Sequence, residues 1–242
     1  MTVEAKPSVM GSVAVVTGGS RGIGYGIATA LAKLGAHVVI TARNAERLAA
    51  AALELSTHGP DCEGMACDIT RWSAVEALAA HVRQKYGRVD VLVNNAGIGG
   101  SACLLQDLAP EKWDDIFDTN VRAVFYMVRA FVPMMGASGS GHIINISSLA
   151  GKNPLPRGAA YSASKWALNG LSYSLAEELR AQNIRVSIVC PGSVDTEFSP
   201  HTGKSPDRML RPEDVAHVVA MLVTQRPQSF VSEVLLRPTQ KP

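Results

Sequence analysis

The chain has 242 residues, of which 47% are hydrophobic, and a formal net charge of +2. This size suits one α/β domain, and the balanced charge gives no electrostatic reason to expect nucleic acid or a membrane surface as a partner. No apolar stretch reaches the roughly 20 residues that cross a bilayer, and residues 1–10 lack a signal-peptide core, so we expect a cytoplasmic protein.

Short apolar runs alternate with longer helical patterns along the whole chain, as βαβ units do. We therefore predict a single Rossmann domain over residues 1–242, with loose tails at 1–8 and 238–242. Its doubly wound, seven-stranded parallel sheet has helices on both faces and binds ligands beyond the carboxyl ends of the strands. The predicted strands are Val13–Thr17, Ala36–Thr41, Glu63–Cys67, Val89–Asn94, His142–Ser147, Arg185–Cys190 and Glu233–Leu236.

The first predicted strand runs directly into a glycine-rich turn. Gly18, Gly22 and Gly24 follow a G-x-x-x-G-x-G pattern, and an apolar periodic stretch then ends at Gly35 in the manner of a helix C-cap. Glycine lets the backbone approach a pyrophosphate, and a helix N-terminus offers free N–H groups and partial positive charge. The turn predicts a dinucleotide site, although the spacing differs from G-x-G-x-x-G and an ordinary glycine-rich turn remains the alternative.

The second predicted strand ends at a cation. A Rossmann unit that binds NAD has an acidic residue here for the ribose 2′-hydroxyl, whereas this chain has Ala42 and Arg43, with no carboxylate until Glu46. Arg21 in the glycine turn is a second cation, and two arginines can converge on a 2′-phosphate. The sequence thus favours NADP(H) over NAD(H); the alternative is that Arg43 simply faces water.

Tyr161 and Lys165 are four residues apart, so on a helix they share one face, downstream of Ser147-Ser148. At roughly 4 Å and an effective dielectric near 20, two unit charges interact by about 4 kcal/mol, or up to roughly three pKa units. An adjacent ammonium is therefore expected to lower the pKa of Tyr161 towards the range of a useful general acid or base. A solvated helix surface is the alternative.

Together these residues resemble the short-chain dehydrogenase/reductase family in its NADP-dependent form, over nearly the whole chain. The matching motifs are the nucleotide loop Thr17–Gly24, Asn94-Asn95-Ala96-Gly97 after the fourth strand, the tetrad Asn120, Ser148, Tyr161 and Lys165, and Pro191-Gly192 with Thr196. The resemblance implies reversible hydride transfer between NADP(H) and a carbonyl or secondary alcohol.

The resemblance also assigns residues to the cofactor. Asp68 would meet the adenine amino group with Ile69 behind the ring, although Asp68 also suits the N-cap of a helix starting near Trp72. The expected cofactor-binding residues are Gly18, Ser20, Arg21, Gly22, Ile23, Gly24, Arg43, Asp68, Ile69, Asn95, Ala96, Gly97, Tyr161, Lys165, Pro191, Gly192, Val194 and Thr196.

In the implied mechanism Tyr161 protonates the carbonyl oxygen. Lys165 keeps the tyrosine acidic and bonds the nicotinamide ribose, while Ser148 donates to the oxygen where charge develops. Ser147 is the rival to Ser148, which matches the usual family spacing from Tyr161. Asn120 would hold a water that returns the proton through Lys165; the alternative is a helix-interior Asn bonded to backbone.

Substrate contacts are expected from 150–157, from Gly99–Leu105, and from Ser193–Arg211, which we interpret as a mobile cover rather than core; a plain surface connection is the alternative. Leu149, Leu155 and Phe198 in or beside these segments favour a moderately hydrophobic carbonyl compound. Four scattered cysteines, Cys62, Cys67, Cys103 and Cys190, form no C-x-x-C pair, and no histidine cluster occurs, so we expect free thiols and no metal.

The C-terminal Ser232–Thr239 departs from the commonest family ending and looks like a branch of reductases acting on small carbonyls. One alternative is 3-oxoacyl-carrier-protein reductase, which would dock an acidic acyl carrier protein on a basic patch such as Arg122 and Arg129; these could equally serve a subunit interface. Another is a non-catalytic NADP-binding regulator or scaffold. The family further implies a homo-oligomer, a tetramer or a dimer, built through Trp113–Met134 and Ala159–Ala181.

Overall fold

The computed structural model describes residues 9–100, 102–198 and 205–242 as one Rossmann-like domain, so the predicted N-terminal tail lies outside the described residues. Seven strands form one sheet in the order β3-β2-β1-β4-β5-β6-β7, and every neighbouring pair is parallel. The strands are β1 Val13–Thr17, β2 His37–Ala42, β3 Cys62–Ala66, β4 Val91–Asn94, β5 Gly141–Ile146, β6 Ile184–Pro191 and β7 Glu233–Leu236. The predicted sheet is confirmed, with strand ends shifted by two residues or fewer.

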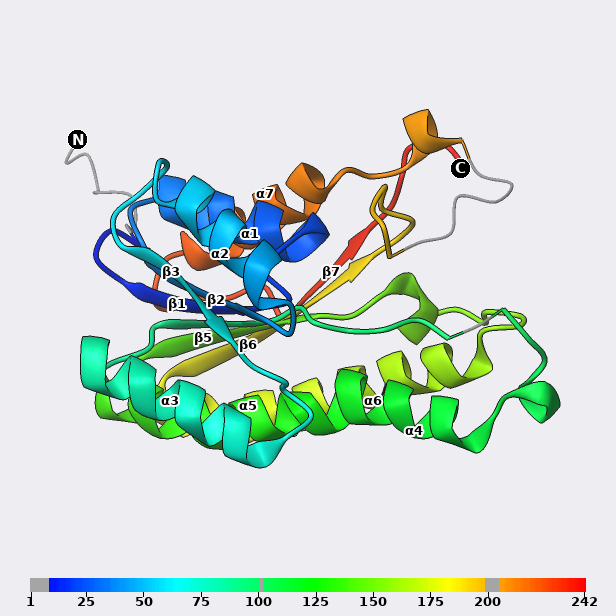
Figure 1. Cartoon of the computed structure of the whole chain (residues 1–242), viewed down its shortest axis with the longest axis horizontal. Helices are drawn as coiled ribbons and strands as arrows, with labels where there is room; N and C mark the ends of the chain where they lie inside the picture. Colours follow the sequence, from blue (N-terminus) through cyan, green and yellow to red (C-terminus); the bar gives the residue numbers. More distant parts are fainter. Residues whose placement is uncertain (1–8, 101, 199–204) are drawn as a thin grey trace.

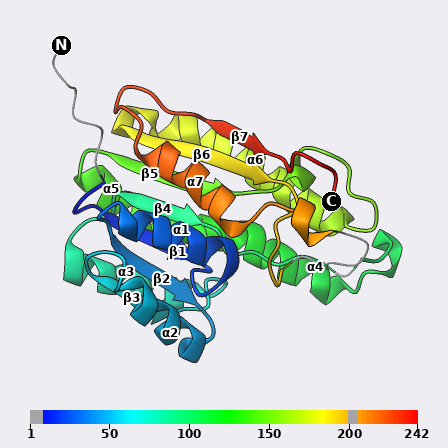
Figure 2. The ribbon, with the colours of Figure 1, turned by 90° about the horizontal axis from the view of Figure 1, so that it is seen from above.

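Helices cover both faces of the sheet (Figures 1 and 2). On one face lie α1 Gly22–Lys33, α2 Ala45–Leu55 and α7 Pro212–Val223. On the other lie α3 Trp72–Tyr86, α4 Pro110–Phe117, α5 Ala123–Ala137 and α6 Ala159–Leu179. Gly35 follows α1 with φ of +88°, in the left-handed region that the predicted C-cap glycine requires.

Two separate cores result from the alternation of side chains along each strand. In β1, Ala14 and Val16 pack into the core beneath α1, α2 and α7, whereas Val13 and Val15 pack against α3, α5 and α6. Both faces are buried, which is why the strands appear in the sequence as continuous apolar runs.

The helix that was expected over Trp113–Met134 is interrupted. A π-helical turn, Asp118–Arg122, joins α4 to α5 and carries Asn120. Such insertions are frequent at functional sites. The turn places Asn120, which is 1% exposed, beneath the loop that follows β4.

The interpretation of Ser193–Arg211 as cover rather than core is wrong for both of its ends. Val194, Met209 and Leu210 are buried, and Val194 forms a parallel bridge with Leu210. Val194 and Leu210, one at each end of the segment, pack into the core beneath α1, α2 and α7. Residues 199–204, its centre, lie outside the described residues.

The predicted loose tail at 238–242 is likewise wrong at its first residue. A Cβ placed on Gly192 would lie 2.9 Å from Cδ of Pro238, so the two residues are packed together. The Gly192 amide also donates to the Leu236 carbonyl over 2.8 Å. The chain end therefore backs the turn after β6.

Candidate active site

A cavity of about 1160 Å³ lies along the carboxyl edge of the sheet, where β1 and β4 meet and the strand order reverses. This is the ligand position of doubly wound sheets. All of the predicted cofactor-binding residues line it, as do Ser148, Tyr161 and Lys165 of the predicted tetrad. Asn120 does not, although its neighbour Thr119 does.

Tyr161 and Ser148 meet at one end of this cavity. Ser148 follows β5 as the N-cap of a short 3₁₀ turn, and its hydroxyl lies close enough to the Tyr161 phenol to lower the pKa of that phenol. Ser147 instead points towards α6, where its hydroxyl lies 3.5 Å from the Lys165 carbonyl. The structure therefore places Ser148, rather than its rival, beside the phenol.

Lys165 lies one helical turn beyond Tyr161 and is 4% exposed. Its Nζ donates to the Ile146 carbonyl at the end of β5 over 3.0 Å and lies 5.8 Å from the Tyr161 ring centroid. Burial lowers the pKa of Lys165 to about 8. The ammonium is thus held between the sheet and α6, and burial brings its pKa close to neutral pH.

Burial raises the pKa of Tyr161, and the Ser148 hydroxyl opposes that rise. The prediction that the pKa of Tyr161 is lowered is therefore wrong, because the net shift is upward. The reason is that burial disfavours the charged forms of both side chains, an effect that the attraction between two charges alone does not include.

Asn120 holds the loop after β4. Its Oδ1 accepts from the Ile98 amide over 2.8 Å, and its Nδ2 donates to the Ile98 carbonyl and to the Ser164 hydroxyl over 2.9 and 3.0 Å. Ser164 in turn donates to the Tyr161 carbonyl over 2.7 Å. These bonds are the alternative that the sequence left open, an Asn bonded to backbone, and the proton relay stays a prediction.

The glycine turn is closed against the loop after β4. A Cβ on Gly24 would lie 2.3 Å from the Gly18 carbonyl, and one on Gly18, whose φ is +65°, would lie 2.9 Å from Asn95 Nδ2. Thr17, the first residue of the nucleotide loop, has a role that the motif did not predict: its Oγ1 accepts from the amides of Asn95 and Ala96, both over 3.0 Å. A polar residue ending a buried strand was the available signal for Thr17.

Three arginines gather at the other end of the cavity, where β2 ends. Arg21 and Arg43 were predicted there; Arg47, in the first turn of α2, was missed although it follows Arg43 by four residues. Glu197, from the segment after β6, accepts hydrogen bonds from Arg21 and, over 3.2 Å, from Nη1 of Arg47. Glu197 lies 176 and 150 residues from Arg21 and Arg47 in the sequence, so no local pattern predicts these contacts.

Asp68 lines the same cavity but is not the cap of α3. Its Oδ1 accepts from the amide and the hydroxyl of Thr70 over 3.1 and 2.7 Å, and the N-cap position belongs to Arg71. The carboxylate thus shapes the turn after β3 and lines the cavity. Its predicted contact with adenine stays a prediction.

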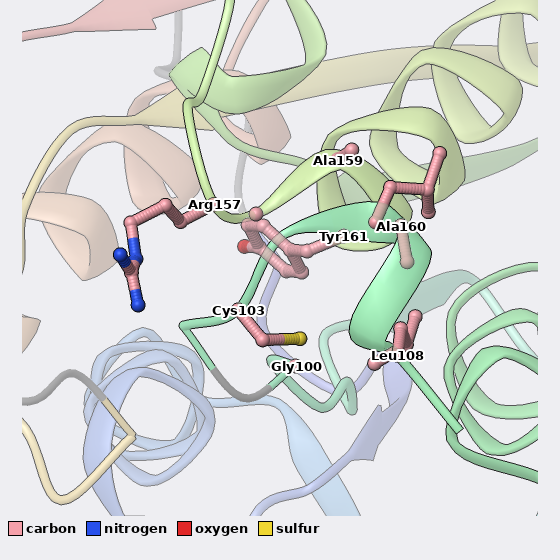
Figure 3. A pocket seen from close by; sticks show the side chains of 9 residues that line it. Gly100, Cys103, Leu108, Arg157, Ala159, Ala160 and Tyr161 are labelled. Atoms are coloured by element: carbon pink, nitrogen blue, oxygen red, sulfur yellow. The ribbon is translucent and has the colours of Figure 1, made fainter.

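The expected substrate segments do line the cavity beside Tyr161, among them Leu149, Leu155 and Phe198. The Phe198 ring centroid lies 6.0 Å from that of Tyr161. A smaller pocket opens on the Tyr161 ring, which Cys103 and Arg157 flank (Figure 3). Arg157, with φ of +62°, donates from Nη2 to the Ala102 carbonyl over 3.0 Å, which joins two of the predicted wall segments.

Cys62, Cys67 and Cys190 are buried free thiols and Cys103 is a partly exposed one, as expected. Among the described residues, no cluster of three His, Cys, Asp or Glu side chains could hold a metal ion. Over the same parts of the chain, no helix is both long and apolar enough to cross a membrane.

Comparison with known protein families agrees with this fold and this cavity. A family model described as short chain dehydrogenase matches residues 12–207. The chain therefore belongs to the short-chain dehydrogenase family, and it is an oxidoreductase of that family.

Three similar proteins carry more specific names. A metagenomic short-chain oxidoreductase in complex with NADP is 50% identical, with a TM-score of 0.86 over 96% of this chain and 99% of that one. An alcohol dehydrogenase from the archaeon Thermococcus sibiricus, complexed with 5-hydroxy-NADP, is 32% identical, with a TM-score of 0.88 over 96% and 98% of the two chains. A 3beta-hydroxysteroid dehydrogenase of Mediterraneibacter gnavus is 40% identical over 187 residues, which are 77% of this chain and 67% of that protein.

Proposed function

We propose that the protein transfers hydride reversibly between NADP(H) and a carbonyl or secondary alcohol, with Tyr161 as the general acid and base. One observation carries the proposal: the Tyr161 phenol lies beside Ser148 and one helical turn from buried Lys165, in a cavity that the glycine turn also lines. A bound nicotinamide would supply the hydride, while the protein supplies the proton and the position.

The residues present fit a 2′-phosphorylated dinucleotide. The carboxylate of Glu197 already bridges Arg21 and Arg47, which demonstrates that both guanidiniums reach a single anion in this cavity. Arg43 lines the same end. Arginine forks suit phosphate geometry, and the named NADP complexes of similar proteins support the same choice.

In the direction of reduction, Tyr161 gives its proton to the carbonyl oxygen while Ser148 donates a hydrogen bond to the same oxygen. A raised tyrosine pKa keeps the phenol protonated at neutral pH, which is the form that reduction consumes. Lys165, with a pKa of about 8, can return a proton and would hydrogen-bond the nicotinamide ribose. Alcohol oxidation needs the phenolate, so its rate should rise with pH.

The substrate we propose is a small, moderately hydrophobic ketone or the corresponding secondary alcohol. Leu149, Leu155 and Phe198 supply the apolar part of the wall, and the names of the similar alcohol and hydroxysteroid dehydrogenases agree with this chemistry. The two arginines considered for an acidic carrier protein have local partners: Arg122 pairs with Asp118 over 2.6 Å, and Arg129 lies over the Trp72 ring. No described contact favours carrier docking over a free substrate.

We also propose a homo-oligomer, tetramer or dimer. Large apolar side chains are exposed on the face formed by α4, α5 and α6, at Trp113, Phe125, Trp166 and Tyr173. Light scattering of the purified protein measures the assembly directly, and a monomer at micromolar concentration would contradict it.

The test of the catalytic proposal is NADPH oxidation across a panel of ketones, with NADH in parallel and with the Tyr161→Phe variant. Removing the phenol proton should lower turnover by about 10³-fold, while the Kd for NADPH changes little. Tyr126→Phe is the control, because Tyr126 packs on Trp72 and does not line the cavity. Turnover of Tyr161→Phe at the wild-type rate would exclude this acid, and NADPH binding without turnover of any ketone would favour the regulator.

A further inference from the structure

Glu197 is the acidic residue among the arginines at the phosphate end of the cavity. It lies six residues beyond β6, beside Thr196, which is in contact with the glycine turn: a Cβ on Gly22 would lie 3.4 Å from Cγ2 of Thr196. From there its carboxylate reaches Arg21 on one side and Arg47 on the other. The segment after β6 is thereby joined to the glycine turn and to α2.

Glu197 occupies two of the three arginines that are available to a 2′-phosphate at this end of the cavity. Arg47 belongs to the first turn of α2, whose N-cap Asn44 accepts from the Arg47 amide over 2.8 Å, so the positive end of this helix faces the same place. In Rossmann folds a 2′-phosphate is bound by arginine near the end of the second strand. An internal carboxylate and a cofactor phosphate therefore compete for the same two guanidiniums.

We propose that Glu197 is a specificity-determining residue that competes with the 2′-phosphate for Arg21 and Arg47. The inference rests on the proposed use of NADP(H). A 2′-phosphate carries more negative charge than a carboxylate and displaces Glu197, whereas a 2′-hydroxyl leaves the carboxylate and both arginines paired. Glu197 thus weakens NADPH binding, leaves NADH binding unchanged, and reduces the discrimination between them.

A positioning role for Glu197 would have the opposite sign. If the carboxylate held the arginines in the correct orientation for phosphate, its loss would weaken NADPH binding. The competing pairs are exposed, with 54% of the Arg21 side chain and 62% of the Glu197 side chain accessible, and exposed ion pairs are individually weak. We therefore expect an effect of about threefold to tenfold, which high salt reduces.

Calorimetric titration with 2′,5′-ADP and 5′-AMP separates the 2′-phosphate from the rest of the cofactor. In Glu197→Gln, the Kd for 2′,5′-ADP and for NADPH should fall about threefold to tenfold, while the Kd values for 5′-AMP and NADH stay within about twofold. Glu177→Gln is the matched control, since it removes one exposed glutamate that pairs with Arg180 at the end of α6. Repeating Glu197→Gln in an Arg21→Gln, Arg47→Gln background should abolish the gain.

The outcomes separate this inference from the proposed function. Suppose that the wild type binds 2′,5′-ADP more tightly than 5′-AMP, and that Glu197→Gln binds 2′,5′-ADP no more tightly than the wild type does. The competition is then excluded, and the preference for NADP(H) stands. If neither the wild type nor Glu197→Gln distinguishes the two nucleotides, the competition and the proposed preference for NADP(H) are both overturned. A gain that persists without the two arginines would also overturn the competition, because it would then be a general effect of charge.

Discussion

The two ends of the cavity differ in how much water reaches their charged groups. At the Tyr161 end, Lys165 is 4% exposed and hydrogen-bonded to the sheet, whereas at the other end the Arg21 and Arg47 side chains are 54% and 49% exposed. Burial governs the first group: it lowers the pKa of Lys165 to about 8 and raises that of Tyr161. At the second end the cations remain hydrated, and interactions between them and anions are weaker and sensitive to salt.

This contrast fits a division of tasks. A proton donor must change its protonation state near the working pH, and desolvation is the means by which a protein moves a pKa. A phosphate-binding group has only to stay charged and reachable, and exposed arginines do so. The same contrast predicts that substitutions at the buried end change turnover and stability together, whereas those at the exposed end change cofactor choice.

Lys165→Met should show the largest combined effect. Turnover should fall by about 100-fold, because the group beside Tyr161 no longer assists it. Because burial opposes its charge, Lys165 costs stability at neutral pH; after allowance for the lost bond to the Ile146 carbonyl, the variant should gain about 2 kcal/mol in free energy of unfolding. Urea denaturation at pH 7 measures this gain, with Lys112→Met on the exposed surface as the control.

The pH dependence of that gain follows from the sign of the shift. The folded-state pKa of Lys165, about 8, lies below its unfolded value of 10.5, so the unfolded wild type binds more protons between those pH values. Wild-type stability attributable to Lys165 therefore rises from about pH 8 to about pH 10.5. The advantage of Lys165→Met should disappear over that window, and an advantage independent of pH would argue against a buried ammonium.

Arg43→Asp tests the exposed end. The substitution removes a cation from the end of β2 and supplies an acceptor for a ribose 2′-hydroxyl, so the ratio of NADPH to NADH affinity should fall by about 30-fold. Arg83→Asp on the exposed side of α3 makes the same charge change away from the cavity. Titration of both cofactors measures the ratio of NADPH to NADH affinity. In the wild type this ratio should fall as salt is added, because salt screens the exposed cations. An equal loss for NADPH and NADH would remove Arg43 from phosphate recognition.

The sequence predicted the buried end of the site better than the exposed end. Ser148 follows the end of an apolar strand, so the rules of parallel sheets were enough to bring it to this edge, and the family resemblance added Tyr161 and Lys165. What pattern could not supply was the effect of burial on the Tyr161–Lys165 pair, since desolvation depends on segments packed from the whole chain.

At the exposed end, Arg43 was found because it replaces an expected carboxylate, but Glu197 depends on a contact across 176 residues that leaves no periodicity to detect. The ends of Ser193–Arg211 were missed for a similar reason. Their buried residues, Val194, Met209 and Leu210, are too few to form a periodic pattern, and Val194 and Leu210 are buried by tertiary contacts with the core beneath α1, α2 and α7.

Ser164→Ala probes the boundary between packing and catalysis, with the smallest expected effect. Ser164 accepts from Asn120 and donates to the Tyr161 carbonyl, so it connects the π-helical turn to the helix that carries the phenol. Ser172 is a matched control on the same helix: it is buried, accepts from Asn145 over 2.8 Å and donates to the Leu168 carbonyl over 2.6 Å. Each alanine variant should lose about 1 kcal/mol in free energy of unfolding.

Only Ser164→Ala should also lower kcat, by about threefold, because Asn120, which holds the loop after β4, then loses its bond to the helix that carries Tyr161. KM should change little in either variant, since neither serine lines the cavity. Steady-state kinetics and urea denaturation of both variants make the comparison. If Ser164→Ala and Ser172→Ala lower kcat equally, the bond between Asn120 and Ser164 supports the fold alone. If only Ser164→Ala lowers kcat, Ser164 is a residue that positions Tyr161.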